Sequence, residues 1–199
     1  MIIRRTVSLA VLVITLGVAG LSAQTGDAEV YKKFLDLTTS TPEAYVAGDK
    51  TSAATQAKAL IEMASQYPKD WNYGNAIHTG YIVLGRIAAD AGRIDEARED
   101  LYKSVTFGES SSGGVPPAKP VFKASPQMDS FGPDMSLASE LLAKGDKAAV
   151  VKYLDLCATF WETNNGSLAL WRKQIDAGEV PNFGPNVNYV FAKQARGDR

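Results

Sequence analysis

The sequence has little of what metal and disulfide chemistry requires. Its 199 residues contain one histidine, His78, and one cysteine, Cys157. No ligand-type residues flank His78 at metal-binding spacing, so a zinc site of the usual nitrogen and sulfur ligands cannot be built within the chain. A single cysteine excludes an internal disulfide, and the apolar neighbours of Cys157 indicate that it is packed in a helix rather than reactive.

Motifs for catalysis and cofactor binding are also missing. The chain has no Gly-x-Ser-x-Gly elbow, no glycine-rich phosphate loop and no Asp/Asn series of a calcium loop. His78 is expected to be a lone histidine that is partly buried or at the surface. The acidic residues between 95 and 100 are typical of a solvated helix start. We therefore expect no catalysis and assign no catalytic residue, no metal and no cofactor.

A basic surplus is absent as well. The first 23 residues contain two arginines and no acid, so the remaining chain has 19 basic and 22 acidic residues and a net charge of −3. Nucleic acid binding requires a dense basic face, so no nucleic acid partner is expected. No second long apolar run follows the N-terminal one, so no membrane span is expected after it.

Residues 1–23 have the layout of a secretory signal peptide. Two arginines precede an apolar run that ends in small residues. We predict cleavage after Ala23, with Ala19 and Ser22 as alternative sites, and therefore periplasmic or secreted localisation. An uncleaved membrane anchor is the alternative, because the apolar segment is just long enough to span a bilayer. Cleavage would leave one domain, residues 24–199.

Helical periodicity dominates residues 24–199. Apolar and small residues recur every three to four positions, and no stretch alternates in the manner of a strand. We predict an all-α fold with a helix that starts just before Pro42 and with helical hairpins that turn at Gly92 and Gly145.

The segment 108–130 has no helical period and is rich in proline, glycine and serine. It is longer than the usual connection in a compact domain. Two interpretations remain open, a mobile insertion and an ordered loop that packs across the helices. The second is favoured by apolar residues unusual in a simple tether: Val115, Val121, Phe122, Met128 and Phe131.

Two stretches 53 residues apart align on their glycine turns. Large residues recur where helices fill a groove, and small residues recur where backbones approach each other. The matched pairs are Leu84 with Leu137, Gly85 with Ala138, Gly92 with Gly145, Leu101 with Leu154, and Ser104 with Cys157. The pattern resembles the tetratricopeptide-repeat (TPR) family, best over residues 78–109 and less closely over 131–162. The second stretch is also similar to segments of exported bacterial proteins.

The TPR resemblance implies stacked antiparallel helical hairpins, an α-solenoid fragment, and a protein or peptide partner. It also implies that the first helix of each hairpin lines a concave binding side. The candidate partner-binding residues are Thr79, Ile82, Arg86, Ala89, Asp90, Met135, Ser139 and Leu142. The leading hypothesis is an exported protein-binding adaptor or assembly factor of the bacterial envelope, with its oligomeric state open. The alternatives are an enzyme or small-ligand-binding protein that uses 108–130 as a lid, and a purely structural envelope component.

Aromatic residues are the one surplus near the predicted helix ends. We expect most of them in the core or between repeats and one or two as anchors for a partner, because Trp and Tyr dominate binding hot spots. They are Trp71, Tyr73, Phe160, Trp161 and Trp171.

The tripeptide Phe-Gly-Pro occurs twice, beginning at Phe131 and at Phe183, and is followed by Asp134 in one copy and Asn186 in the other. We predict the same role for both copies, a helix start rather than a ligand loop. Glycine would supply the bend, proline would occupy the first turn, and phenylalanine would pack back on the body.

Overall fold

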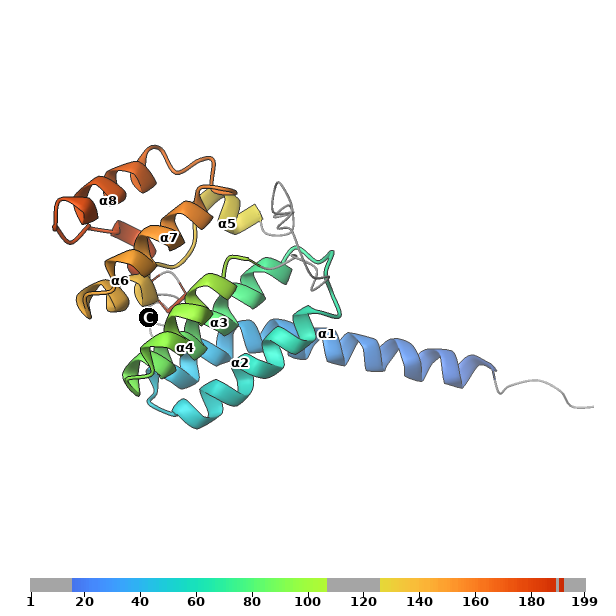
Figure 1. The fold of residues 1–199 in the computed structure, drawn as a ribbon. Coiled ribbons are helices and arrows are strands. Elements are labelled where there is room, and N and C mark those ends of the chain that lie inside the picture. The colour runs from blue at the N-terminus through green and yellow to red at the C-terminus, as the bar shows by residue number, and fades with distance from the viewer. Residues whose placement is uncertain (1–15, 107–125, 189, 192–199) are drawn as a thin grey trace, which may run out of the picture. The chain divides into compact units, whose positions relative to one another are not determined.

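The computed structural model describes residues 16–106, 126–188, 190 and 191. Every regular element in these ranges is a helix, which confirms the all-α fold class (Figure 1). The elements are α1 Leu16–Val46, α2 Lys50–Ala64, α3 Tyr73–Asp90, α4 Ile94–Lys103, α5 Pro126–Phe131, α6 Ser136–Ala143, α7 Lys147–Cys157, α8 Ser167–Asp176 and the 3₁₀ helix η1 Gly184–Asn188.

The chain divides into two units, residues 1–33 and 34–199, and α1 belongs to both. Much of the predicted signal peptide, residues 1–15, lies outside the described residues. From Leu16 the backbone is helical through the predicted cleavage point. Within the described ranges, no helix is both long enough and apolar enough to cross a membrane. The packing described below is that of the second unit.

The predicted helix start before Pro42 is wrong, because α1 continues through this proline to Val46. A proline inside a helix removes one backbone hydrogen bond and usually ends or kinks the helix. Thr41 and Pro42 are both buried. Burial of this side of the helix offsets part of the cost of the missing bond, a tertiary effect that local sequence does not report.

Three turns with the same geometry connect α1 to α2, α3 to α4, and α6 to α7. Each contains a glycine with positive φ, at Gly48 (84°), Gly92 (75°) and Gly145 (89°). The residue after each glycine donates its N–H to the carbonyl five residues earlier, as Asp146 does to Leu141 over 2.9 Å. This is the Schellman pattern of helix ends. The predicted turns at Gly92 and Gly145 are confirmed.

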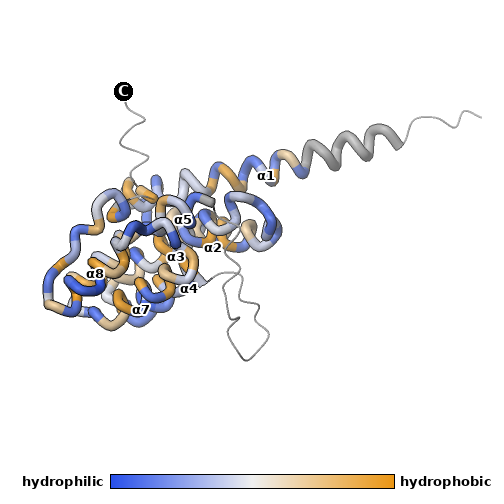
Figure 2. The backbone as a smooth tube through the Cα atoms, turned by 90° about the horizontal axis from the view of Figure 1, so that it is seen from above, coloured by the Kyte–Doolittle hydropathy of each residue, from blue (hydrophilic) through white to orange (hydrophobic). Residues whose placement is uncertain are grey.

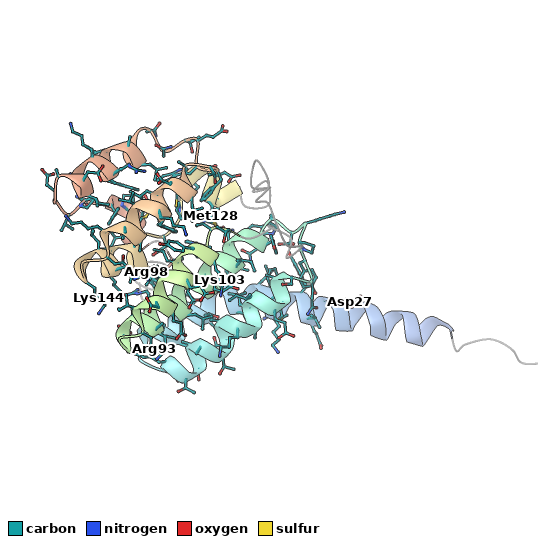
Figure 3. The ribbon with its side chains drawn as sticks, viewed as in Figure 1. Asp27, Arg93, Arg98, Lys103, Met128 and Lys144 are labelled. Carbon is teal, nitrogen blue, oxygen red and sulfur yellow. The ribbon has the colours of Figure 1, made fainter. Side chains whose placement is uncertain are left out.

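Helix α3 packs on α2, α4 and α6, while α7 packs on α4, α6 and α8. Polar and apolar stretches alternate along these helices, as expected when one face is buried (Figure 2). Gly85 permits the approach of α3 to α6, because a Cβ atom there would lie 2.3 Å from Leu137 Cδ2. Arg98, labelled in Figure 3, links α4 to the turn before α7 by donating to Asp146 Oδ2 over 2.7 Å.

Most of the predicted loop 108–130 lies outside the described residues, which resume at 126. The predicted end of the loop is wrong, because residues 126–130 belong to α5. Met128 (Figure 3) is fully buried, whereas Phe131 is exposed. The apolar residues Val115, Val121 and Phe122 are outside the described residues.

The described part of the C-terminal segment, residues 183–188, 190 and 191, is called the C-terminal strap below. It lies against the start of α6, where Met135 N–H donates to Asn186 O over 2.7 Å. Val190 N–H donates to Asp134 Oδ2, also over 2.7 Å. The strap therefore connects to the N-terminus of α6 through Asn186 and Val190.

Candidate functional site

A cavity of about 230 Å³ lies among residues of α1, the turn before α3, α3 itself, α5 and the C-terminal strap. Leu35, Trp71 and Val190 supply its apolar part. The other lining residues are threonine, asparagine, glutamine and one histidine, and among the residues that the structure describes none of the lining side chains is an acid, a lysine or an arginine. This described lining therefore combines fixed polar groups with a larger apolar surface and, with the histidine neutral, carries no charge.

One wall of the cavity is a chain of side-chain hydrogen bonds. Asn72 Nδ2 donates to Thr38 Oγ1 over 2.9 Å, and Thr38 Oγ1 donates to Phe34 O over 3.3 Å. Asn75 Nδ2 donates to Asn72 Oδ1 over 3.4 Å. Because each of these side chains orients the next, the polar wall has a defined geometry.

Trp71 stands on the turn between α2 and α3. Asp70 Oδ1 shapes this turn by accepting the N–H of Asn72 over 2.8 Å. The Trp71 side chain lines the cavity and is 57% exposed. Three of the other aromatic residues that the sequence singled out are buried, as expected for core positions: Phe160, Trp161 and Trp171. Trp71 is thus exposed, whereas Trp161 and Trp171 are buried.

His78 lines the cavity but is only 1% exposed. Its Nε2 lies 2.9 Å from the backbone N–H of Asp134, and its Nδ1 lies 3.1 Å from Ser104 O. A backbone N–H can only donate, so Nε2 is the acceptor and Nδ1 carries the proton. Burial lowers the pKa of His78 to about 4. The imidazole is therefore neutral at pH 7, with both nitrogens engaged in holding α3 to its neighbours.

Asp134 is fully buried beside this histidine and outside the cavity lining. Its Oδ1 accepts from Ser136 N–H and its Oδ2 from Val190 N–H, each over 2.7 Å. The hydroxyl of Tyr153 donates to Asp134 O over 3.1 Å. Burial raises the pKa of the Asp134 carboxyl to about 6. Asp134 therefore connects α6, α7 and the C-terminal strap through hydrogen bonds.

Most of the residues predicted to line a partner-binding groove are not at the surface. Five of the eight are buried, so the expectation that they line an open concave side is wrong: Thr79, Ile82, Ala89, Met135 and Leu142. Thr79 instead contributes to the cavity. The helical period of the sequence predicts that these residues share a face of α3 or of α6. It does not reveal which other segments cover those faces.

Arg86 shows what covers part of this face. Its Nη2 and Nε lie 2.6 and 2.7 Å from Glu140 Oε1. Its guanidinium lies over two aromatic rings, 4.8 Å from the centroid of Tyr45 and 4.4 Å from that of Phe191. The end of α1 and the C-terminal strap therefore occupy the place that the TPR resemblance assigns to a partner.

The two remaining candidates, Asp90 and Ser139, are not fully buried. Asp90 Oδ2 accepts from the Tyr45 hydroxyl and pairs with Lys50 Nζ, both at 2.9 Å. The Asp90 carboxylate thus contacts side chains of this protein on α1 and α2.

The two Phe-Gly-Pro copies contact each other. Asn186 Nδ2 donates to Phe131 O over 2.9 Å and to Pro133 O over 3.0 Å. Pro185 lies inside η1, but Pro133 precedes α6, which begins only at Ser136. The prediction that proline opens a helix is therefore wrong for the first copy. The sequence shows the repetition but contains no signal that the copies pair.

Cys157 is buried, and burial raises the pKa of its thiol. The expectation of a packed cysteine is confirmed. Among the residues that the structure describes, no three side chains of His, Cys, Asp or Glu gather in a metal-binding arrangement.

Comparison of the chain with protein-family models, curated proteins and solved structures gave no match. A functional proposal therefore rests on the cavity, on the exposed Trp71, and on the contacts of Arg86 with the end of α1 and with the C-terminal strap.

Proposed function

We propose that this chain is an exported binding protein without a catalytic step, and that the uncharged cavity beside Trp71 holds part of its ligand. The observation that carries the proposal is the combination of an exposed tryptophan with a hydrogen-bonded polar wall in one concavity. Ligand sites are concave, with an apolar surface and a few fixed polar groups. Export is supported by the layout of residues 1–23.

The absence of a catalytic step is supported by the environment of the titratable groups. Perturbed pKa values often mark active sites. Here, however, both nitrogens of His78 are engaged. Asp134 and Asp100, whose carboxyl pKa values burial raises to about 6, lie outside the cavity lining. Among His78, Asp134 and Asp100, no nitrogen or carboxylate oxygen is therefore placed to take a proton from a molecule in the cavity.

A TPR-like hairpin stack remains part of the proposal. It is supported by the three Schellman turns and by the contacts of α3 and α4 with α6 and α7. A small-molecule binder built from such hairpins needs no open groove, because its cavity lies between the helices.

Protein binding in the manner of an adaptor is the second candidate, and one observation favours it. The face of α3 and α6 already binds a segment of this chain, the C-terminal strap, through backbone hydrogen bonds and the ring of Phe191. A partner segment could use the same contacts only by displacing the strap. This candidate therefore predicts that removal of the strap exposes a peptide-binding face.

The cavity proposal is tested by a thermal-shift screen of the chain against uncharged metabolites, neutral oligosaccharides and short neutral peptides. A ligand at 100 times its Kd stabilises the folded state by about 2.7 kcal/mol, which is readily measured. The wild type should be stabilised and Trp71→Ala should not. Leu170→Ala is the matched control, because Leu170 is also an exposed apolar residue but lies on α8.

Equal stabilisation of the wild type and Trp71→Ala by every ligand that binds would contradict the cavity proposal. Arg86→Glu is a poor probe of either candidate. It would place two carboxylates together at Glu140 and remove the contact with Phe191, so loss of folding would mimic loss of binding.

A further inference from the structure

We propose that the ligand of this cavity is a neutral carbohydrate, with one sugar ring stacked on Trp71 and its hydroxyls bonded to the polar wall. This inference rests on the proposed function and names its ligand class.

The indole of Trp71 offers a platform for a sugar ring. Trp71 is exposed and lies on a turn that is held by the Asp70 carboxylate and by the Tyr73 N–H, which donates to Asp70 O over 3.1 Å. The face of an aromatic ring is electron-rich. The C–H groups on one face of a sugar ring carry partial positive charge, so they pack favourably on such a face. An exposed indole on a turn whose backbone is held in this way therefore suits a sugar ring better than a long aliphatic side chain would.

The polar groups of the lining suit hydroxyl groups. Thr39, Thr79 and Gln127 each offer both donor and acceptor capacity. A sugar hydroxyl also donates and accepts, so it can pair with these groups in either direction. A purely apolar ligand would leave the buried Thr79 hydroxyl and the nearby amides without water, which is unfavourable.

The described lining carries no charge. Within residues 16–106, 126–188, 190 and 191, no lysine, arginine, aspartate or glutamate lines the cavity. A phosphate, a nucleotide or a free amino acid would lose solvation on entry without gaining an opposite charge, which is strongly unfavourable. His78 cannot supply a positive charge at neutral pH, because its Nε2 accepts a backbone N–H. Uncharged ligands are therefore preferred.

The size of the cavity suits a single sugar ring. The cavity of about 230 Å³ is smaller than the roughly 300–1,000 Å³ typical of sites that enclose a whole drug-sized ligand. One ring fits, and the rest of an oligosaccharide would remain outside, where Trp71 is accessible to it.

The inference is tested by fluorescence titration of the chain with neutral oligosaccharides of glucose and of N-acetylglucosamine, and in parallel with neutral tetrapeptides. Trp161 and Trp171 are buried, so a change in emission on binding reports mainly on Trp71. Isothermal calorimetry then gives the affinity for each variant.

We expect saccharide binding that Trp71→Ala weakens about tenfold or more, and that Trp71→Phe weakens less because the ring face is retained. Gln127→Leu should also weaken binding, since it keeps the volume but removes the polar atoms. Leu170→Ala should bind as the wild type does.

Saccharide binding that is equal in the wild type and Trp71→Ala would overturn the inference. Binding of tetrapeptides but of no saccharide, lost in Trp71→Ala, would overturn the carbohydrate assignment and leave the proposed function standing. Binding of no probe, with all variants folded by circular dichroism, would overturn the carbohydrate inference, and the wider thermal-shift screen then decides on the proposed function.

Discussion

Phe183 and Phe131 begin the same tripeptide, yet the Phe183 side chain is 1% exposed and that of Phe131 is 67% exposed. Phe183 packs edge-on against Trp171, with ring centroids 5.1 Å apart. Phe131 contributes its backbone carbonyl to Asn186 while its side chain remains in solvent. The expectation that both rings pack back on the body is correct only for Phe183. A local motif thus sets a bend, but its neighbours decide which side chain is buried.

The glycines of the two copies differ in the same way. Both have positive φ, 80° at Gly132 and 59° at Gly184. A Cβ atom on Gly132 would lie 2.5 Å from the ring of Trp161, whereas nothing lies within 4 Å of one on Gly184. Gly132 is therefore required for its backbone conformation and for space, and Gly184 for its conformation alone.

The aromatic residues connect the copies to each other. The ring of Trp161 packs against Gly132, and its centroid lies 5.9 Å from that of the Trp171 ring, which in turn contacts Phe183. These ring contacts and the hydrogen bonds of Asn186 connect two segments that are far apart in the sequence. Four sets of variants test how much each copy contributes to the stability of the protein.

The largest effect is expected from the phenylalanines. Phe183→Ala should destabilise the protein by about 3–5 kcal/mol, because it removes a fully buried ring and leaves a cavity beside Trp171. Phe131→Ala should change the free energy of unfolding by less than about 0.5 kcal/mol, as is usual for exposed positions. Urea unfolding followed by circular dichroism measures both. Similar losses in the two variants would show that the copies are equivalent.

The glycines should differ next. Gly184→Ala should cost about 1–2 kcal/mol, the penalty for a left-handed backbone with a Cβ atom. Gly132→Ala should cost about 1–3 kcal/mol more, because Trp161 must also move. The difference in thermal unfolding between the two variants isolates the steric contribution. Equal destabilisation would mean that the Trp161 ring shifts at no cost.

Asn186 should show how much the hydrogen-bonded contact between the copies contributes. Asn186→Ala leaves two carbonyls without their donor and should cost about 1–3 kcal/mol. Asn182→Ala is the control and should cost less, because Asn182 is exposed and its side chain accepts the Gly184 N–H rather than bridging the two copies. The two unfolding midpoints in urea give the comparison, and a larger loss in the control would contradict it.

The smallest effect is expected in the pH dependence of stability, because two groups oppose each other. The pKa of Asp134 is raised to about 6, so its contribution is present below the ordinary aspartate value of 3.8 and is lost as pH rises through about 6. The pKa of His78 is lowered to about 4, so its contribution is present above the ordinary histidine value of 6.5 and is lost as pH falls through about 4.

Asp134→Asn separates these two contributions. The stability of the wild type relative to this variant should fall as pH rises from about 4 to about 6, because only the wild type retains the buried carboxyl. Urea unfolding at several pH values in this interval gives the difference. Parallel curves for the two proteins would show that the titration of Asp134 does not contribute.

Predictions from the sequence were most successful where the chemistry is local. The helical period and the glycines at 92 and 145 require no partner elsewhere in the chain, and both were predicted correctly. The prediction for Pro42 failed because burial of α1 offsets a local penalty. The position and the lining of the cavity were not predicted. Trp71, Thr38 and Gln127 belong to three separate segments, and no pattern in the sequence links them.

The amino-acid sequence by itself determined that the fold is helical, where two hairpins turn, and that one cysteine and one histidine leave few options for metal chemistry. The tertiary structure alone decided that Arg86 meets Phe191, that the two Phe-Gly-Pro copies pair, and that Trp71 stays exposed beside a polar wall. The physical reason is that backbone conformation follows from neighbouring residues. Burial and hydrogen-bond partners, in contrast, depend on groups that only folding brings together.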